Sequence, residues 1–381
     1  MKPAATAIAA LLIALPLVIA SANDLPQDSA QPAAESADWP VFRGDAQATG
    51  VARTTLPENP RLLWSRKFED SAFETAPVIV EGVIYVGDYK GVVHALKLGD
   101  GSSLWKHETG LGIAAAAAVR EGRVYVGDIQ GKFVCLSAED GTKIWETEAG
   151  AEINGGANFH GLNVLFGSQD ATLYCLNALT GESVWEHQIA DQIRCSPTIV
   201  EGRAFLAGCD GKLHIIDVEK GTSTGDVAID APTGSTPAAV GDFIYFGTEG
   251  GTLFCINWKQ AEVAWKYQSP RSNQPIRSSA AVHDGLVVFG SRDRQIHALD
   301  AASGDAKWTF PTRGQVDGSP VIVGERAFIG SADGRLYGLS LANGENVWTY
   351  DAGGRFIASP AVAESRLVIG SDDGTLYCFG E

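Results

Sequence analysis

An internal repeat limits what this chain can fold into more than any other feature of the sequence. Its unit, Thr75 to Trp105, holds three short apolar runs, split by Glu81-Gly82 and Asp88 to Gly91 and followed by Asp100-Gly101 and a tryptophan. Such runs between glycine-containing turns are typical of antiparallel strands. The residue that ends the second run recurs every 40 residues, with one interval of 43, and occupies eight places: Gly87, Gly127, Gly167, Ala207, Gly247, Gly290, Gly330 and Gly370. The pattern predicts an all-β fold, an eight-bladed β-propeller of four-stranded antiparallel blades.

The tryptophan that ends each unit is predicted to wedge between successive blades, and it recurs at Trp105, Trp145, Trp185, Trp265, Trp308 and Trp348. Blade four has Gly225 instead, which predicts the weakest junction of the ring. Leu62 to Ser65 look like a fourth strand without the other three, while Ser359 to Phe379 supply three strands and no fourth. We therefore expect the N-terminal strand to complete blade eight, with Trp64 as its tryptophan, because this closure covers an unpaired sheet edge.

The charge of the chain argues against one class of partner. Its formal net charge is -17, and no basic stripe is present that would neutralise phosphates. We therefore expect no nucleic-acid partner.

The N-terminus reads as an export signal. Met1 to Ala22 combine one lysine, an apolar run and the small-residue cleavage site Ala20-Ser21-Ala22, which predicts a signal peptide at 1–22. Residues 23–37 are rich in Pro, Ala, Ser and Gln and are predicted to be a disordered linker before the propeller at 38–381. We expect an exported, periplasmic or extracellular monomer with no integral membrane span after cleavage. The absence of a cysteine near residue 20 argues against a lipoprotein anchor.

The cysteines and histidines recur at repeat positions. Four cysteines share one slot on the third strand of their blades and are predicted to be buried free thiols: Cys135, Cys175, Cys255 and Cys378. Cys195 and Cys209 lie near adjacent strand ends of blade four, where either a disulfide or two free thiols fit the pattern. His94, His214 and His297 share another third-strand position and are interpreted as packing residues rather than metal ligands.

One position just before each predicted first strand is richer in polar residues. First strands line the central channel of a propeller, so these residues should form a ring at one mouth, whose polar members are Glu74, Asn154, Arg194, Arg277 and Asp317. The next position inward is small in every blade. The ring either solvates a water-filled channel or binds a ligand. In the second case Glu74 and Asn154 suit a hard cation, Arg194 and Arg277 suit an anion, and Asp317 suits a base.

The blade-closing segments also carry a family resemblance. AEDGTKIW, ALTGESVW and AASGDAKW resemble the tryptophan-docking motif of the PQQ-like propeller repeat family, which includes quinoprotein dehydrogenases and BamB-like assembly factors. DWPVFRGD and LPENPRLLW are similar to the entry segment of secreted PQQ-like repeat proteins, many of them planctomycetal. The dehydrogenases of this family bind a tricarboxylate quinone and Ca²⁺ near the ring. This fold hosts both enzymes and scaffolds.

Loop lengths favour a binding platform over a catalyst. One inter-blade connection, between blades five and six, is three residues longer than the others, and its segment YQSPRSNQPIR carries Tyr267 and Arg271 as protein-binding candidates. We therefore predict a non-catalytic exported scaffold, BamB-like, without a cofactor and with an envelope protein as partner. The alternatives are a small quinoprotein oxidoreductase that uses PQQ and Ca²⁺, and a ligand- or glycan-binding propeller.

Overall fold

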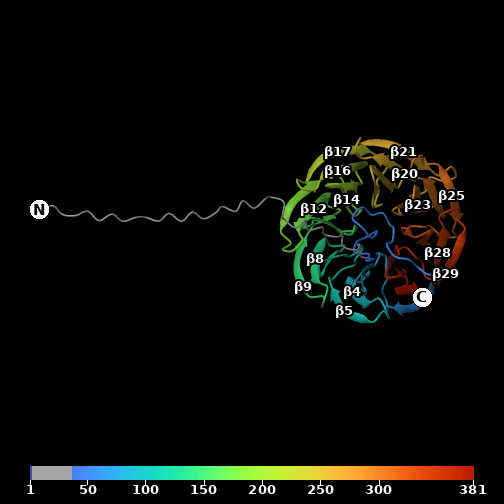
Figure 1. Ribbon diagram of the computed structural model, residues 1–381, viewed down its shortest axis with the longest axis horizontal. Coiled ribbons are helices and arrows are strands. Elements are labelled where there is room, and N and C mark those ends of the chain that lie inside the picture. Colours follow the sequence, from blue (N-terminus) through green and yellow to red (C-terminus); the bar gives the residue numbers. More distant parts are fainter. Residues whose placement is uncertain (2–36) are drawn as a thin grey trace. The chain divides into compact units, whose positions relative to one another are not determined.

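The computed structural model describes Met1 and residues 37–381, and the latter form eight four-stranded antiparallel sheets arranged in a ring (Figure 1). The predicted eight-bladed propeller is confirmed. Residues 2–36 lie outside the described residues. They include the predicted signal peptide at 1–22, except Met1, and the predicted linker at 23–37, except its last residue. Within 37–381 no helix has the length and apolar character needed to cross a membrane.

Each blade runs from a short innermost strand to an outer edge. The innermost strands are β2 (Val78–Val80), β6 (Ala118–Arg120), β10 (Asn158–His160), β14 (Thr198–Val200), β18 (Ala238–Val240), β22 (Ala281–His283), β26 (Val321–Val323) and β30 (Ala361–Ala363). The second strands are β3 (Val83–Gly87), β7 (Arg123–Gly127), β11 (Asn163–Gly167), β15 (Arg203–Ala207), β19 (Phe243–Gly247), β23 (Leu286–Ser291), β27 (Arg326–Gly330) and β31 (Arg366–Gly370).

The outer half of each blade is equally regular. The third strands are β4 (Val92–Lys97), β8 (Lys132–Ser137), β12 (Thr172–Asn177), β16 (Lys212–Asp217), β20 (Thr252–Asn257), β24 (Gln295–Asp300), β28 (Arg335–Ser340) and β32 (Thr375–Gly380). The outer strands are β5 (Ser103–Glu108), β9 (Lys143–Glu148), β13 (Ser183–Gln188), β17 (Thr222–Ala228), β21 (Glu262–Gln268), β25 (Ala306–Pro311), β29 (Asn346–Asp351) and β1 (Arg61–Lys67).

The ring closes through its two ends. Strand β1 pairs antiparallel with β32, from Arg61 opposite Gly380 to Lys67 opposite Thr375, so the N-terminal strand is the outer strand of blade eight. The indole of Trp64 then donates to the carbonyl of Leu98 in blade one at 3.0 Å. The predicted closure is confirmed, and no third-strand edge of blade eight is left open.

Each docking tryptophan bonds to the next blade in the same way. The indole N–H groups donate to backbone carbonyls at 2.8–3.1 Å, in the pairs Trp64–Leu98, Trp105–Ala138, Trp145–Ala178, Trp185–Val218, Trp265–Ala301, Trp308–Leu341 and Trp348–Pro60. The indole ring also packs against a glycine in a turn of the next blade. At Gly101, for example, φ is 68° and a Cβ would lie 2.8 Å from Trp64, so a side chain at this turn would displace the indole.

Blade four lacks this tryptophan, and at its junction with blade five the tryptophan comes from blade five instead. Trp258 of blade five packs edge-on against Phe205 of blade four, with ring centroids 5.4 Å apart. In other blades the residue equivalent to Phe205 contacts the docking tryptophan, as Tyr85 does with Trp105. Trp258 therefore fills part of the space that Gly225 leaves empty, which the repeat pattern alone did not reveal.

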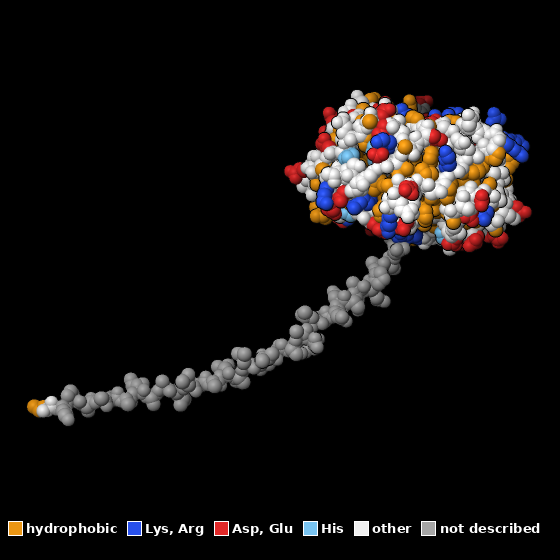
Figure 2. All heavy atoms as spheres, turned by 90° about the horizontal axis from the view of Figure 1, so that it is seen from above, with side chains coloured by type: hydrophobic (Ala, Val, Ile, Leu, Met, Phe, Trp, Pro, Cys, Tyr) orange, Lys and Arg blue, Asp and Glu red, His pale blue; other side chains and the backbone are white. Residues whose placement is uncertain are grey.

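A β-bulge in the outer strands exposes an apolar residue beside the tryptophan. In blade one, Trp105 pairs with Ala95 and Ser103 with Leu96, so Leu104 is left out of the pairing and is 45 % exposed. Ile144, Val184 and Val347 are exposed in the same way. From the edge of the ring, such apolar side chains are seen among interspersed acidic and basic ones (Figure 2).

The segment before β1 crosses the channel, which the sequence did not predict. We call residues 38–54 the N-terminal strap; in Figure 1 it is the blue chain across the centre of the ring. Its backbone bonds to innermost strands of six blades through the amides of Ile79, Val119, Ile199, Ala239, Val282 and Ile322. Blade three joins through the Asn158 side chain, which donates to Ala46, and blade eight through Thr54 and Ser365. The strap therefore ties all eight blades together.

Two side chains hold the strap in its shape. Asp45 accepts hydrogen bonds from the backbone amides of Gln47 at 3.0 Å and Thr49 at 3.1 Å. Arg43 is 1 % exposed and donates from Nη2 to the carbonyl of Ala280 at 3.3 Å. Its burial lowers the pKa of the guanidinium to about 9, although Asp45 opposes the shift.

Removing the strap together with β1 should destabilise the ring. We expect deletion of residues 23–66 to cause aggregation or a large fall in melting temperature, because blade eight loses an outer strand and the blades lose their common tie. Deletion of 23–37 alone is the control and should match the full chain in thermal melting and gel filtration. A 23–66 deletion that is monomeric and as stable as the control would contradict this closure.

The junction after blade four is open to a single-residue test. We expect Trp258→Ala to lower the free energy of unfolding by about 2–4 kcal/mol, because it removes a large ring between two blades. Val263→Ala, on the exposed face of the same blade, should change it by less than about 0.5 kcal/mol. Equal denaturant midpoints for the two variants would show that Trp258 does not support the junction.

Candidate ligand site at the channel mouth

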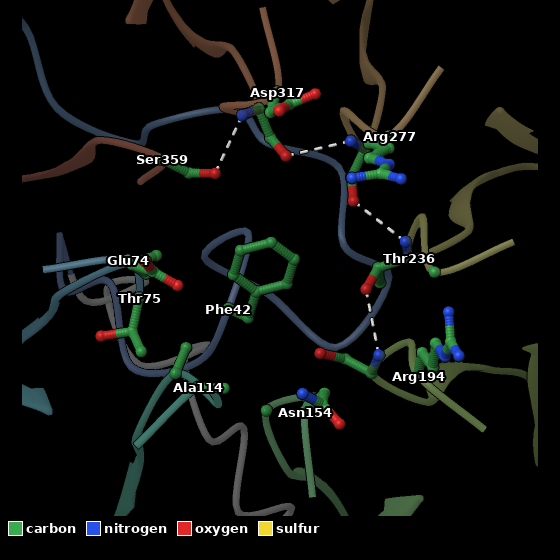
Figure 3. Close-up of a pocket in the computed structure, with 18 of the residues that line it drawn as sticks. Phe42, Glu74, Thr75, Ala114, Asn154, Arg194, Thr236, Arg277, Asp317 and Ser359 are labelled. Carbon is green, nitrogen blue, oxygen red and sulfur yellow. Dashed lines mark hydrogen bonds between the residues drawn. The ribbon is translucent and has the colours of Figure 1, made fainter. Parts of the chain in front are cut away.

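The five polar residues predicted to form a ring do converge on one cavity. Glu74, Asn154, Arg194, Arg277 and Asp317 all line a cavity of about 160 Å³ at the end of the channel where the innermost strands begin (Figure 3). Each residue comes from a different blade and precedes its innermost strand by a few positions. The sequence repeat therefore placed these side chains correctly relative to one another.

The cavity is a cup and not a tunnel. Phe42 of the N-terminal strap lies in the middle of the ring of labelled residues and is part of the cavity lining (Figure 3). A Cβ at Gly156 would lie 3.3 Å from the Cβ of Phe42, so this aromatic side chain packs closely against blade three. Sequence reasoning missed Phe42, because no repeat unit contains it. The only signal was the segment DWPVFRGDAQATG before the first blade.

Below the rim, a chain of hydroxyl groups links blades four to eight. In each of blades four to seven, one backbone amide donates to the hydroxyl of the equivalent residue in the next blade, at 2.9–3.0 Å. The donors are Ser196, Thr236, Ser279 and Ser319, and the last acceptor is Ser359. We call these five residues the hydroxyl belt; the dashed lines in Figure 3, where Thr236 and Ser359 are labelled, mark its hydrogen bonds. Blades one to three have Ala76, Ala116 and Gly156 at this level. The cup therefore has a polar wall and an apolar wall.

Most charges of the rim are paired with neighbours. Arg277 binds Glu249 through two hydrogen bonds of 2.8 and 3.2 Å. Asp317 accepts two hydrogen bonds of 2.8 Å from Arg292, and this bond raises the pKa of the Arg292 guanidinium despite opposing desolvation. Because both carboxylate oxygens of Asp317 already accept hydrogen bonds from Arg292, this residue is a poor candidate for a general base.

The remaining rim residues have neutral partners or none. Arg194 donates twice to the side-chain oxygen of Gln192, at 3.1 and 2.6 Å, and the Asn154 side chain accepts a hydrogen bond from Gln169. Glu74 is exposed and has no hydrogen bond or ion pair within residues 37–381. The rim therefore carries one cation and one carboxylate that nearby charges do not neutralise.

These residues do not fit a quinone with Ca²⁺. The cup alone, at about 160 Å³, is below the ~300 Å³ at which sites for larger ligands begin, and it adjoins a rim cavity of about 400 Å³ that shares Glu74, Arg277 and Asp317 with it. Its polar wall offers hydroxyl groups rather than carboxylates, and Asp317 is already bound to Arg292. Across the part of the chain that the structure describes, no three His, Cys, Asp or Glu side chains gather in a way that could hold a metal ion.

The three third-strand histidines are hydrogen-bonded to buried carboxylates. The Nε2 atoms of His94, His214 and His297 lie 2.9–3.0 Å from Asp88, Asp210 and Asp293. Burial opposes ionisation of Asp293 most strongly, but the interactions with His297 and the hydrogen bonds from Ser291 and the Gln295 amide together outweigh it and lower the pKa of the carboxyl. Tyr174 and Tyr337 bond to Asp170 and Asp333 at the same repeat position. In these five blades the position is therefore held by the same structural hydrogen bond to an aspartate.

All six cysteines are free thiols. Cys135, Cys175, Cys255 and Cys378 are fully buried in the third strands, and burial raises the pKa of the Cys135 thiol to about 11. Cys195 and Cys209 are not paired, since Cys195 Sγ donates to the carbonyl of Ala207 at 3.6 Å and Cys209 Sγ to that of Thr233 at 3.9 Å. The two sulfur atoms therefore bond in different directions.

The structure separates the two residues predicted to bind a protein. Arg271 is exposed on the connection between blades five and six. Tyr267 belongs to strand β21, is half-buried, and packs edge-on against Phe289 and His297 of blade six. Of the two, Arg271 alone lies free on the loop surface.

The ring of tryptophan-docked blades defines the class of this protein, an eight-bladed propeller of PQQ-like repeats. A family model described as outer membrane protein assembly factor BamB matches the overlapping segments 46–146, 89–236, 134–273, 210–350 and 270–380. The chain therefore belongs to this family, and the resemblance inferred from its motifs is confirmed.

Individual relatives are distant. BamB of Shewanella oneidensis is 24% identical over 144 residues, which are 34% of this chain and 36% of that protein. The crystal structure of BamB from Moraxella catarrhalis has a TM-score of 0.73 at 18% identity and covers 84% of this chain and 98% of its own. Quinohemoprotein alcohol dehydrogenase from Comamonas testosteroni has a TM-score of 0.77 at 15% identity, covering 91% and 81%. Identities this low establish the shared fold alone.

Proposed function

We propose that this protein is a non-catalytic, exported scaffold that binds a protein of the cell envelope through the loops around the cup. The observation that carries the proposal is the state of the rim, where Arg277 and Asp317 are engaged by Glu249 and Arg292 and are not free for acid–base chemistry. A rigid ring with short loops and a mixed-charge rim suits recognition of a partner surface. The BamB family match and the expected signal peptide support a place in the periplasm or outside the cell.

A quinoprotein oxidoreductase is the less favoured function. Its support is the likeness in fold to an alcohol dehydrogenase, and a fold alone does not specify chemistry. The small cup and its hydroxyl wall do not suit the quinone, so no catalytic step is assigned to this chain.

Arg271 provides the test of the scaffold function. It is exposed on the longest inter-blade connection, on the same face as the rim, and arginine is frequent among residues that dominate binding energy. We expect Arg271→Glu to reduce the affinity for the envelope partner by about tenfold or more, because it places a carboxylate where the partner meets a guanidinium. The melting temperature should not change, since the side chain is at the surface.

The experiment compares two charge reversals. A photo-reactive residue at Asn273, which is also exposed on this connection, is used to cross-link the partner in intact cells. The partner is then identified and titrated against purified wild type, Arg271→Glu and Lys220→Glu. Lys220 is exposed on a turn at the opposite face, so its reversal should bind as the wild type does. Equal affinities for all three proteins, or no adduct at Asn273, would contradict binding at this face.

A further inference from the structure

The hydroxyl belt holds four hydroxyl groups whose oxygen atoms are already used as acceptors. Thr236, Ser279, Ser319 and Ser359 each accept the backbone amide of the preceding blade and are only 2–7 % exposed. A hydroxyl has one proton to donate as well. Within residues 37–381 no protein acceptor receives these four protons, and all four residues line the cup. The belt therefore presents fixed donors to the cavity.

Ser196 adds a fifth donor at the end of the belt. It is 5 % exposed, lines the cup, and its hydroxyl has no hydrogen-bond partner among the described residues. Its oxygen is not enclosed by protein atoms, so this hydroxyl is free to bond to whatever occupies the cavity. A ligand with acceptor oxygens in the cup can therefore bind it together with the four belt donors.

The opposite wall of the cup is apolar. Ala76, Ala116 and Gly156 occupy the level of the belt in blades one to three, and Phe42 lies beside them. A molecule in this cavity therefore meets hydroxyl donors on one side and carbon atoms on the other. The arrangement suits a compact ligand with an anionic, acceptor-rich end and an apolar body.

We propose that the cup is a binding site for a small oxyanion, with the oxygen atoms held by the hydroxyl belt, Ser196 included, and the rest of the ligand against Phe42. Its volume of about 160 Å³ resembles that of a cavity of ~150 Å³ known to hold benzene, so the part of a ligand inside the cup has roughly six non-hydrogen atoms. Organic carboxylates and inorganic oxyanions share this chemistry, and the apolar wall favours the carboxylates. The site does not depend on the scaffold function.

The charges around the cup predict that the affinity for the oxyanion depends only weakly on salt concentration. Arg277 is neutralised by Glu249 and Asp317 by Arg292, while Arg194 and Glu74 have opposite signs. The rim therefore has little net charge, and binding depends on short hydrogen bonds inside a sheltered cup. Affinity should change by less than about threefold between low and physiological ionic strength, whereas an anion attracted to an exposed arginine is strongly screened.

Calorimetric titration of the purified protein provides the test. The probes are acetate, butyrate, sulfate and phosphate, each at two ionic strengths set with sodium chloride. We expect saturable one-to-one binding of at least one probe. Ser196→Ala should weaken it by about tenfold or more, the loss expected for one hydrogen bond to a charged group. Its melting temperature should stay that of the wild type, because the Ser196 hydroxyl bonds to no protein group.

Ser65→Ala is the matched control, since Ser65 is exposed on the outer strand β1, and it should bind as the wild type does. Binding of butyrate and acetate alone would assign the cup to organic acids, and binding of sulfate or phosphate alone to inorganic oxyanions; either result supports the site. Absence of saturable binding, unchanged affinity in Ser196→Ala, or loss of binding in moderate salt would overturn it. None of these readouts involves the protein partner.

Discussion

The contact between each tryptophan and the next blade is the interaction on which the rest of the structure depends. One indole contributes a hydrogen bond to a neighbouring carbonyl and a large apolar surface against a turn glycine. Burying an aromatic side chain covers ~150–250 Å², an upper limit of about 4–6 kcal/mol for each junction. Seven such contacts close the ring, and Trp258 supports the eighth junction from the other blade. With the blades fixed in this way, the innermost strands hold the belt and the rim in register.

The repeat made the architecture predictable, because the same strand pattern occurs in every blade. A strand that is ambiguous in one blade can therefore be assigned from the others. Blade number, the role of Trp64 and the convergence of Glu74, Asn154, Arg194, Arg277 and Asp317 all followed from one alignment of eight units. What lies outside the repeat was not predictable. Phe42 closes the channel from a segment with no equivalent in any blade, and its position depends on contacts to strands far away in the sequence.

Interactions between side chains of different blades were also beyond the sequence. The alignment showed small residues at the belt, but only the ring geometry shows that each hydroxyl accepts an amide of its neighbour. Asp317 read as a possible base until its bond to Arg292 was known. Tyr267 was predicted to lie on the loop. The sequence does not show that strand β21 continues to pair with β20 as far as Gln268, and this pairing places Tyr267 in the strand.

The N-terminal strap distinguishes this ring from an open propeller channel. It fixes the floor of the cup, and thereby decides how large a molecule can enter and which wall that molecule meets. BamB from Moraxella catarrhalis and a quinohemoprotein alcohol dehydrogenase share the propeller with this chain, so the fold alone does not decide between a scaffold and an enzyme. Here the strap reduces the space at the point where the family's enzymes are expected to hold their cofactor.

Amide hydrogen exchange at the innermost strands tests this arrangement most directly. The amides of Ile79, Val119, Ile199, Ala239, Val282 and Ile322 bond to the strap at 2.7–3.0 Å. We predict that they exchange as slowly as amides of the second strands, because they open only when the strap detaches from the ring. Exchange within seconds, at the rate of exposed loops, with the second strands still protected, would show that the strap does not close the channel.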